Sequence, residues 1–160
     1  MRAVVILLTL ICAQPVWALS CLHFGPRDAY IEARDAPERY VVVTGTLRFD
    51  EKKLPKADPT HQHAPRNTRI PARFAGKALA RGGFTQPFAQ NITLEVDCYG
   101  PWCASAQSGQ TYLAFLAQSD NGYQLSVNPC GGFAFAKPVP KVLRQMRTCF
   151  NGGLCPPTRR

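Results

Sequence analysis

Residues 109–130 of the chain read GQTYLAFLAQSDNGYQLSVNPC, and this stretch decides the fold class. Asn121-Gly122 in its middle is the strongest short signal for a β-hairpin, because both central residues of a type I′ turn need a positive φ. We expect a strand on each side, with Leu116 opposite Val127 and Gln118 opposite Leu125. The unbroken apolar run 112–117 predicts a strand that is covered on both faces, as in the middle of a small barrel.

Three further segments have the composition of strands. Residues 40–50 (YVVVTGTLRFD) are rich in β-branched and aromatic residues, with Gly45 at an expected bulge or bend. In residues 68–79 apolar and polar residues roughly alternate, as in a strand. Pro71 lacks the backbone N–H that a central strand needs, which predicts an edge strand. Residues 88–98 form the remaining expected strand, which ends at Cys98. The sequence therefore predicts about five strands.

A helix is expected near each end of the chain. Pro26 favours a helix start and Pro37 a stop, which predicts a two-turn helix over about 26–35. Pro140 starts the second helix, and the Asn-Gly-Gly of residues 151–153 ends it. Its apolar residues fall on one side: Val142, Leu143, Met146, Cys149 and Phe150. The expected class is α+β, mostly β: a small antiparallel barrel with short N-terminal and C-terminal helices.

Residues 1–18 have the features of a secretory signal peptide. Arg2 precedes an apolar run of about eleven residues, which is too short to span a bilayer as a mature helix. The small residues Val16 and Ala18 favour a cut after Ala18; a cut directly before Cys21 and acylation of Cys21 are the alternatives. Residues 19–160 then form a single exported domain, which we expect in the periplasm or outside the cell.

Six cysteines remain after the signal peptide, and an even number in an exported chain predicts a disulfide framework. Cys149 and Cys155 are expected to form a disulfide bond that fixes the end of the last helix. One pairing of the others joins Cys98 to Cys103 across a Gly-Pro turn and Cys21 to Cys130. The competing pairing joins Cys21 to Cys98 and Cys103 to Cys130. In CYGPWC four residues separate the sulfurs rather than two, which favours a structural bridge over a redox loop.

The positive charge is concentrated in two segments. Residues 51–81 hold eight Lys or Arg and two acids, residues 137–160 hold six and no acid, and residues 82–136 hold no Lys or Arg. If the two segments adjoin in the fold, they attract polyanions such as acidic glycans, lipid head groups or nucleic acid. A basic, solubilising surface without a specific partner is the alternative interpretation. The candidate anion-binding residues are Lys52, Lys53, Lys56, Arg66, Arg69, Arg73, Lys77, Arg81, Lys141, Arg144 and Arg147.

Signals for metal binding and catalysis are weak. His61 and His63 lie in a proline-rich loop and could offer two imidazoles to copper or zinc, but a specific site needs three or four ligands. The sequence has no Gly-x-Ser-x-Gly elbow, no His-Glu-x-x-His and no phosphate-binding loop. We therefore expect neither a cofactor nor catalytic residues. We also expect a monomer.

Several short stretches resemble the netrin-like module, a family that includes the tissue inhibitors of metalloproteinases. They are GQTYLAFL (109–116), GYQL (122–125) and Pro129-Cys130, with Cys98 upstream and a lone cysteine soon after the signal peptide. The resemblance covers roughly residues 21–150, with motif-like detail only in 98–130. It implies an OB-fold barrel for this chain.

The same resemblance implies an inhibitory activity against metalloproteases. In that family the mature chain begins at a cysteine whose α-amino nitrogen and carbonyl oxygen chelate the catalytic zinc of the target protease. Cys21 could do this only as the first residue, and a cut after Ala18 leaves two residues in front of it. His23 also stands where the family has its second cysteine.

The sequence thus predicts an exported, disulfide-bonded binding module without catalytic activity, which contacts anionic or protein partners through a basic loop and helix face. The partner could be a protein, an acidic glycan or a membrane surface outside the cytoplasm. A metalloprotease inhibitor acting through Cys21 and a structural accessory protein of the cell envelope are the alternative functions.

Overall fold

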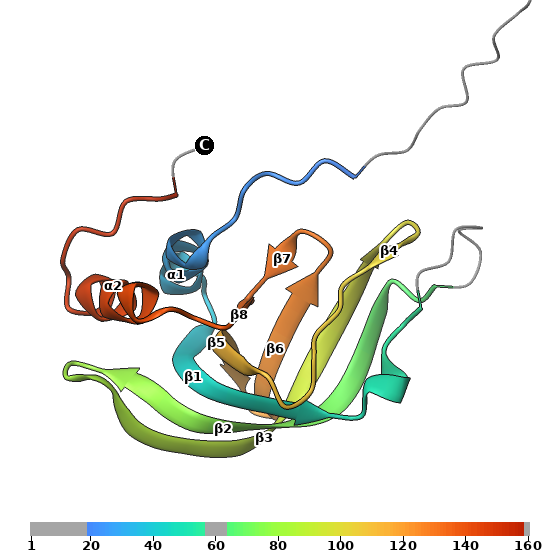
Figure 1. Ribbon diagram of the computed structural model, residues 1–160, viewed down its shortest axis with the longest axis horizontal. Coiled ribbons are helices and arrows are strands. Elements are labelled where there is room, and N and C mark those ends of the chain that lie inside the picture. Colours follow the sequence, from blue (N-terminus) through green and yellow to red (C-terminus); the bar gives the residue numbers. More distant parts are fainter. Residues whose placement is uncertain (1–18, 57–63, 159–160) are drawn as a thin grey trace, which may run out of the picture.

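The computed structural model describes residues 19–56 and 64–158, which form eight strands and two α-helices (Figure 1). The five long strands are β1 (Arg39–Phe49), β2 (Asn67–Ala80), β3 (Gly83–Tyr99), β5 (Thr111–Ser119) and β6 (Gly122–Asn128). The short strands are β4 (Trp102–Cys103), β7 (Gly131–Gly132) and β8 (Ala134–Ala136). The helices are α1 (Pro26–Asp35) and α2 (Pro140–Phe150), and a 3₁₀ turn, η1 (Glu51–Lys53), follows β1.

The five long strands pair in a closed circuit. β1 pairs antiparallel with both β2 and β5, β2 pairs with β3, and β5 pairs with β6. A parallel pairing of residues 92–96 in β3 with residues 123–127 in β6 returns the circuit to its start. The mostly β, mainly antiparallel class with a helix near each end is therefore confirmed.

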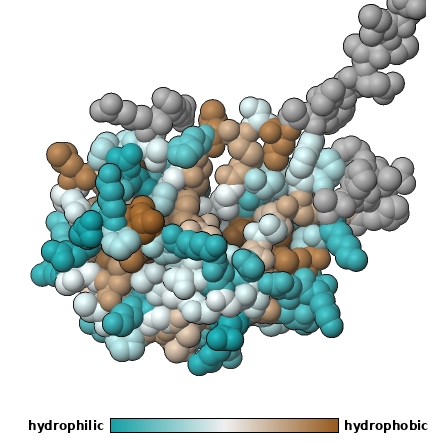
Figure 2. Space-filling model, in the orientation of Figure 1, coloured by the Kyte–Doolittle hydropathy of each residue, from teal (hydrophilic) through white to brown (hydrophobic). Residues whose placement is uncertain are grey.

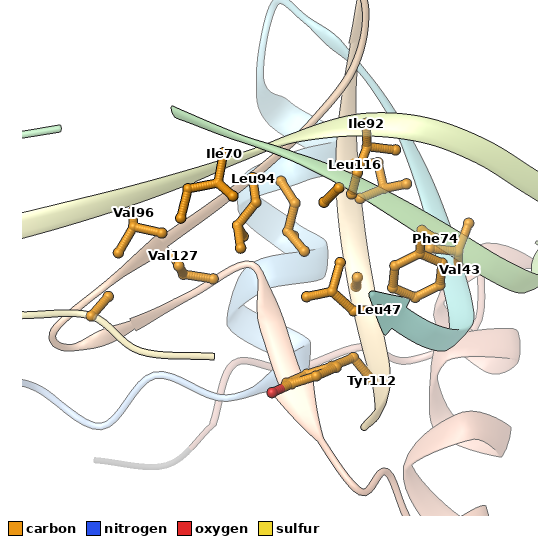
Figure 3. Close-up of a cluster of buried hydrophobic side chains, with 14 of the residues drawn as sticks. Val43, Leu47, Ile70, Phe74, Ile92, Leu94, Val96, Tyr112, Leu116 and Val127 are labelled. Atoms are coloured by element: carbon orange, nitrogen blue, oxygen red, sulfur yellow. The ribbon is translucent and has the colours of Figure 1, made fainter. Parts of the chain in front are cut away.

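The main hydrophobic cluster draws on all five strands of the circuit, as Figure 3 shows. Side chains alternate along each strand, so every second residue points into this cluster. Its large members include Val43, Leu47, Ile70, Phe74, Ile92, Leu94, Val96, Tyr112, Leu116 and Val127. The residues between them lie on the opposite face of the strands.

Strand β5 is buried on both faces, as the apolar run predicted. Tyr112, Ala114 and Leu116 belong to the main cluster. Leu113 and Phe115 belong to a second cluster, which lies between the strands and the two helices. The helices contribute Ala29, Ala33, Met146 and Cys149 to it. The expected apolar side of α2 is also confirmed except for Phe150, which is 44% exposed.

The predicted register of the β5–β6 hairpin is wrong by two residues. Ser119 pairs with Gly122 and Gln118 with Tyr123, so the turn is centred on Asp120-Asn121. Gly122 has a φ of 103°, whereas Asn121 keeps a negative φ, and a type I′ turn at 121–122 is therefore not formed. A shift by two leaves every side chain on its expected face, since the period of a strand is two.

The edge-strand prediction for residues 68–79 is also wrong, because β2 lies between β1 and β3. Pro71 is tolerated because the pairing with β1 ends at Ala72, and beyond this residue β2 has only β3 as a neighbour. The expected bulge at Gly45 is absent from the β1–β2 pairing, where Gly45 lies opposite Gly76 in an unbroken register.

Candidate functional site

The predicted anion-binding residues fall into three groups, and all of them are exposed. Lys52 and Lys53 lie in η1, and Lys56 and Arg66 lie on either side of residues 57–63, which the structure does not describe. Arg69, Arg73 and Lys77 lie on β2. The third group, at the tip of the β2–β3 hairpin and on α2, is Arg81, Lys141, Arg144 and Arg147.

Strand β2 holds its three basic residues on one face. Ile70, Ala72 and Phe74 point into the main cluster, so Arg69, Arg73 and Lys77 lie on the opposite, exposed face. Residues four apart in a strand lie about 13 Å apart along it. The three side chains therefore extend over about 27 Å of the surface.

Arg48 joins this group, although the sequence analysis did not nominate it. In the β1–β2 pairing Arg48 lies directly opposite Arg73, and it is exposed. Directly opposed residues of an antiparallel pair have Cβ atoms about 5 Å apart. Arg48 lies between the apolar residues Leu47 and Phe49, which indicates that its side chain points outward. Only the β1–β2 register shows that Arg73 is its neighbour. We call Arg48, Arg69, Arg73 and Lys77 the basic row.

One end of the basic row is neutralised and its middle is not. Arg69 Nε lies 2.7 Å from Oε1 of Glu95, which is only 7% exposed and lies opposite it on β3. Oε1 accepts no hydrogen bond despite this distance, so the contact is an ion pair without hydrogen-bond geometry. Arg73 donates from Nη1 to Oδ1 of Asn91 at 3.4 Å. Within residues 19–56 and 64–158, Arg48, Arg73 and Lys77 form no ion pair.

Arg81 and the C-terminal end of α2 meet at the tip of the β2–β3 hairpin, and Figure 1 shows α2 above the hairpin. The Asn151 side chain donates from Nδ2 to the carbonyl oxygen of Arg81 at 3.0 Å. A Cβ added to Gly83 would lie 3.4 Å from Cδ of Arg147, so Arg147 covers this glycine. Figure 2 shows hydrophilic residues on this side of the molecule and along its lower edge.

A pocket of about 690 Å³ lies near the amino end of the described chain. The segment 20–24 lines it together with α1, Tyr99, Phe133 and Thr158. Cys21 is exposed at this pocket and is bonded to Cys130. Zinc chelation by Cys21 would require this residue to come first in the mature chain, so the inhibitor function stays a prediction.

The carboxylate of Asp28 organises this end of the molecule. It accepts the backbone N–H of Gly25 at Oδ2 and that of Thr158 at Oδ1, both at 2.9 Å. Partial burial raises the pKa of Asp28, but hydrogen bonds from Thr158 and Gly25 outweigh it and hold the pKa below its ordinary value. The ionised carboxylate therefore ties the C-terminal tail to the start of α1.

The structure pairs the cysteines as Cys21–Cys130, Cys98–Cys103 and Cys149–Cys155. This is the first of the two pairings that the sequence left open. Cys98 and Cys103 are cross-strand partners of β3 and β4 and close the turn between them. Three disulfides are compatible with a protein that folds in an oxidising space.

His61 and His63 lie outside the described residues, as does the predicted signal peptide. In the part of the chain that is described, no three His, Cys, Asp or Glu side chains gather closely enough to hold a metal ion. Neither helix found there has the length and apolar character needed to cross a bilayer.

Comparisons of the chain with protein-family models, with curated proteins and with solved structures find no match. Its function is therefore inferred from the geometry and charge of these surfaces.

Proposed function

We propose that this protein is an exported, disulfide-bonded binding module that folds as an OB-like barrel and binds anionic partners on its basic outer surface. The closed circuit of five strands around one hydrophobic cluster supports the barrel. The three disulfides support export. The proposal assigns no catalytic step to the protein.

The observation that carries the binding function is the cross-strand pair Arg48 and Arg73. Like charges directly opposite one another destabilise a sheet. Here the described residues supply no acid to offset them, while Arg69 on the same strand has its own buried carboxylate. Two neighbouring guanidinium groups that have no counterion among the described residues are suited to an external anion such as a sulfate, carboxylate or phosphate.

Two double variants with the same change in net charge test this function. In the first, Arg48→Gln and Arg73→Gln remove the cross-strand pair; in the second, Arg34→Gln and Arg39→Gln remove two exposed arginines elsewhere. Binding of labelled dextran sulfate is measured by fluorescence anisotropy at about 0.15 M salt, where nonspecific charge effects are largely screened. We expect the first variant to bind at least tenfold more weakly, because each charge-assisted contact contributes about 1.5–3 kcal/mol.

The control should change affinity less than threefold. Equal weakening in both variants would show that net charge alone attracts the polyanion, and the binding function would then be wrong. Loss of the fold does not explain a weaker first variant, since removal of opposed like charges leaves stability unchanged or raises it by a few tenths of a kcal/mol.

Metalloprotease inhibition through Cys21 is the second candidate, and one observation favours it. Cys21 is exposed beside the 690 Å³ pocket and is held there by its bridge to Cys130. Sequencing of the mature amino terminus is the test: Leu19 as first residue excludes chelation, and Cys21 as first residue supports it.

A further inference from the structure

We infer that the anionic partner of the basic row is a linear acidic polysaccharide that lies along β2. This inference rests on the proposed function and specifies its ligand. It follows from the spacing of the basic side chains, from the residues beside them and from the chemistry of the guanidinium groups.

The spacing of the basic side chains indicates a polymer. Arg69 is paired with Glu95, so the positive charge left for a ligand is that of Arg48, Arg73 and Lys77. Arg73 and Lys77 lie about 13 Å apart along the strand, which is more than one small anion can contact. Arg48 doubles the charge beside Arg73. A chain with acidic groups at intervals can contact all three residues at once, and its affinity then grows with length until they are covered.

The residues beside the row suit sugars better than bases. Apart from the acids Glu95 and Asp97 at one end, the residues opposite β2 on this face that flank the row are small or carry hydroxyl and amide groups, namely Thr44, Thr46, Pro87, Ala89, Asn91 and Thr93. None of these described partners is aromatic, whereas proteins that bind single-stranded nucleic acid stack the bases on aromatic side chains. Hydroxyl and amide groups can instead hydrogen-bond to sugar hydroxyls.

The same face does not suit a lipid surface. Interfacial binding needs exposed apolar side chains that enter the membrane beside the basic ones. The exposed large apolar residues in the described part of the chain are Leu22, Tyr99, Val139, Phe150 and Leu154. None of them is a cross-strand partner of the basic row.

The guanidinium groups of the row suit the acidic groups of such a polymer. Arg73 donates one hydrogen bond from Nη1 to Asn91, and among the described residues its other N–H groups and those of Arg48 are left for a ligand. Guanidinium groups bind planar carboxylates and the sulfates of acidic sugars through paired N–H donors.

Three probes of different chemistry test the inference at about 0.15 M salt. They are heparin oligosaccharides of increasing length, single-stranded oligothymidylate of matched charge, and phosphatidylcholine vesicles that contain phosphatidylglycerol. We expect the long oligosaccharides to bind at least tenfold more tightly than the DNA, and the vesicles to bind least. Affinity for the oligosaccharides should rise with length and then level off.

Lys77 at the end of the row provides the matched variant. Lys77→Gln should weaken binding of the long oligosaccharides at least threefold and binding of the shortest ones by less. Lys77→Arg and the control Arg39→Gln should bind both the long and the short oligosaccharides as the wild type does. DNA or vesicles that bind as tightly as the oligosaccharides would overturn the polysaccharide while leaving the proposed function in place. If the variant with Arg48→Gln and Arg73→Gln binds every probe as the wild type does, the proposed function itself fails.

Discussion

Asp28 joins the start of α1 to the C-terminal tail. Its two carboxylate oxygens accept the backbone N–H groups of Gly25 and Thr158. These hydrogen bonds favour the charged form, which is why the pKa of Asp28 falls although partial burial opposes the change. A carboxyl group whose pKa is lower in the folded state stabilises the fold above its unfolded-state pKa.

Replacement of Asp28 with Asn should lower the free energy of unfolding at pH 7 by about 1–2 kcal/mol, because the neutral amide accepts these hydrogen bonds less strongly. The stabilisation in the wild type is complete above pH 3.8, the ordinary pKa, and is lost as the pH falls through the lower folded-state value. The difference between the two proteins should therefore shrink in acid. Urea unfolding from pH 7 down to pH 2 measures it.

Asp120→Asn, in the exposed β5–β6 turn, is the control for the change of charge. This variant should differ from the wild type by less than about 0.5 kcal/mol at every pH. A difference between the wild type and Asp28→Asn that stays constant down to pH 2 would contradict the assigned role of the carboxylate.

The sequence predicted most residues of the basic surface but not their neighbours. Arg69 and Arg73 looked alike in the charge pattern, yet the structure gives one a buried carboxylate and the other a second arginine. Arg69 and Glu95 are 26 positions apart, and only the β2–β3 register brings them together. The pattern of charges along a chain carries no information about such a register.

At the level of elements, β1 and β2 approach each other closely where Gly45 lies opposite Gly76. A Cβ added to Gly76 would lie 2.1 Å from the carbonyl oxygen of Thr44, and one added to Gly45 would lie 2.2 Å from that of Ala75. Backbone atoms occupy the space that a side chain would need. A glycine inside a strand is thus explained by the close approach of another backbone rather than by a bulge.

Gly76→Ala should therefore lower the free energy of unfolding by about 2–3 kcal/mol, because the added methyl group forces β1 and β2 apart. The matched control is Gly82→Ala in the β2–β3 turn, where the nearest atom, Cγ2 of Thr85, would lie 3.7 Å from the new Cβ. The control should stay within about 0.5 kcal/mol of the wild type. Urea unfolding of both variants checks this, and equal stability of the two would show that the strands can separate without cost.

The sequence predicted the positions of the helices and strands better than it predicted which strands pair with each other. Both helices start at the expected prolines, Pro26 and Pro140, because proline is favoured in the first turn and disfavoured later. The position of β2 was not foreseen, since Pro71 is compatible with an inner strand only where the neighbouring strand has already ended. The length of a neighbouring strand is a tertiary property.

At the scale of the whole molecule, the parallel pairing of β3 and β6 closes the circuit. Ile92 of β3 lies opposite Tyr123 of β6, with the hairpin turn to β4 and all of β5 between them in sequence. The apolar run of β5 predicted burial on both faces, and the two hydrophobic clusters on either side of this strand provide it. No local pattern indicated which two strands meet at the closure.

The disulfide Cys21–Cys130 connects the amino-terminal segment to this circuit across 109 positions, whereas Cys98–Cys103 spans only 5. In the chain-entropy description, a bridge stabilises the fold by restricting the unfolded chain, and the effect grows with the length of the loop. The paired change Cys21→Ala and Cys130→Ala should therefore cost about 4–5 kcal/mol, and Cys98→Ala with Cys103→Ala about 2 kcal/mol. Urea unfolding of both variants at neutral pH measures the two losses. A smaller loss for the long bridge would mean that the unfolded chain already holds residues 21 and 130 close together, and that the short bridge stabilises the fold mainly through packing of the buried Cys98.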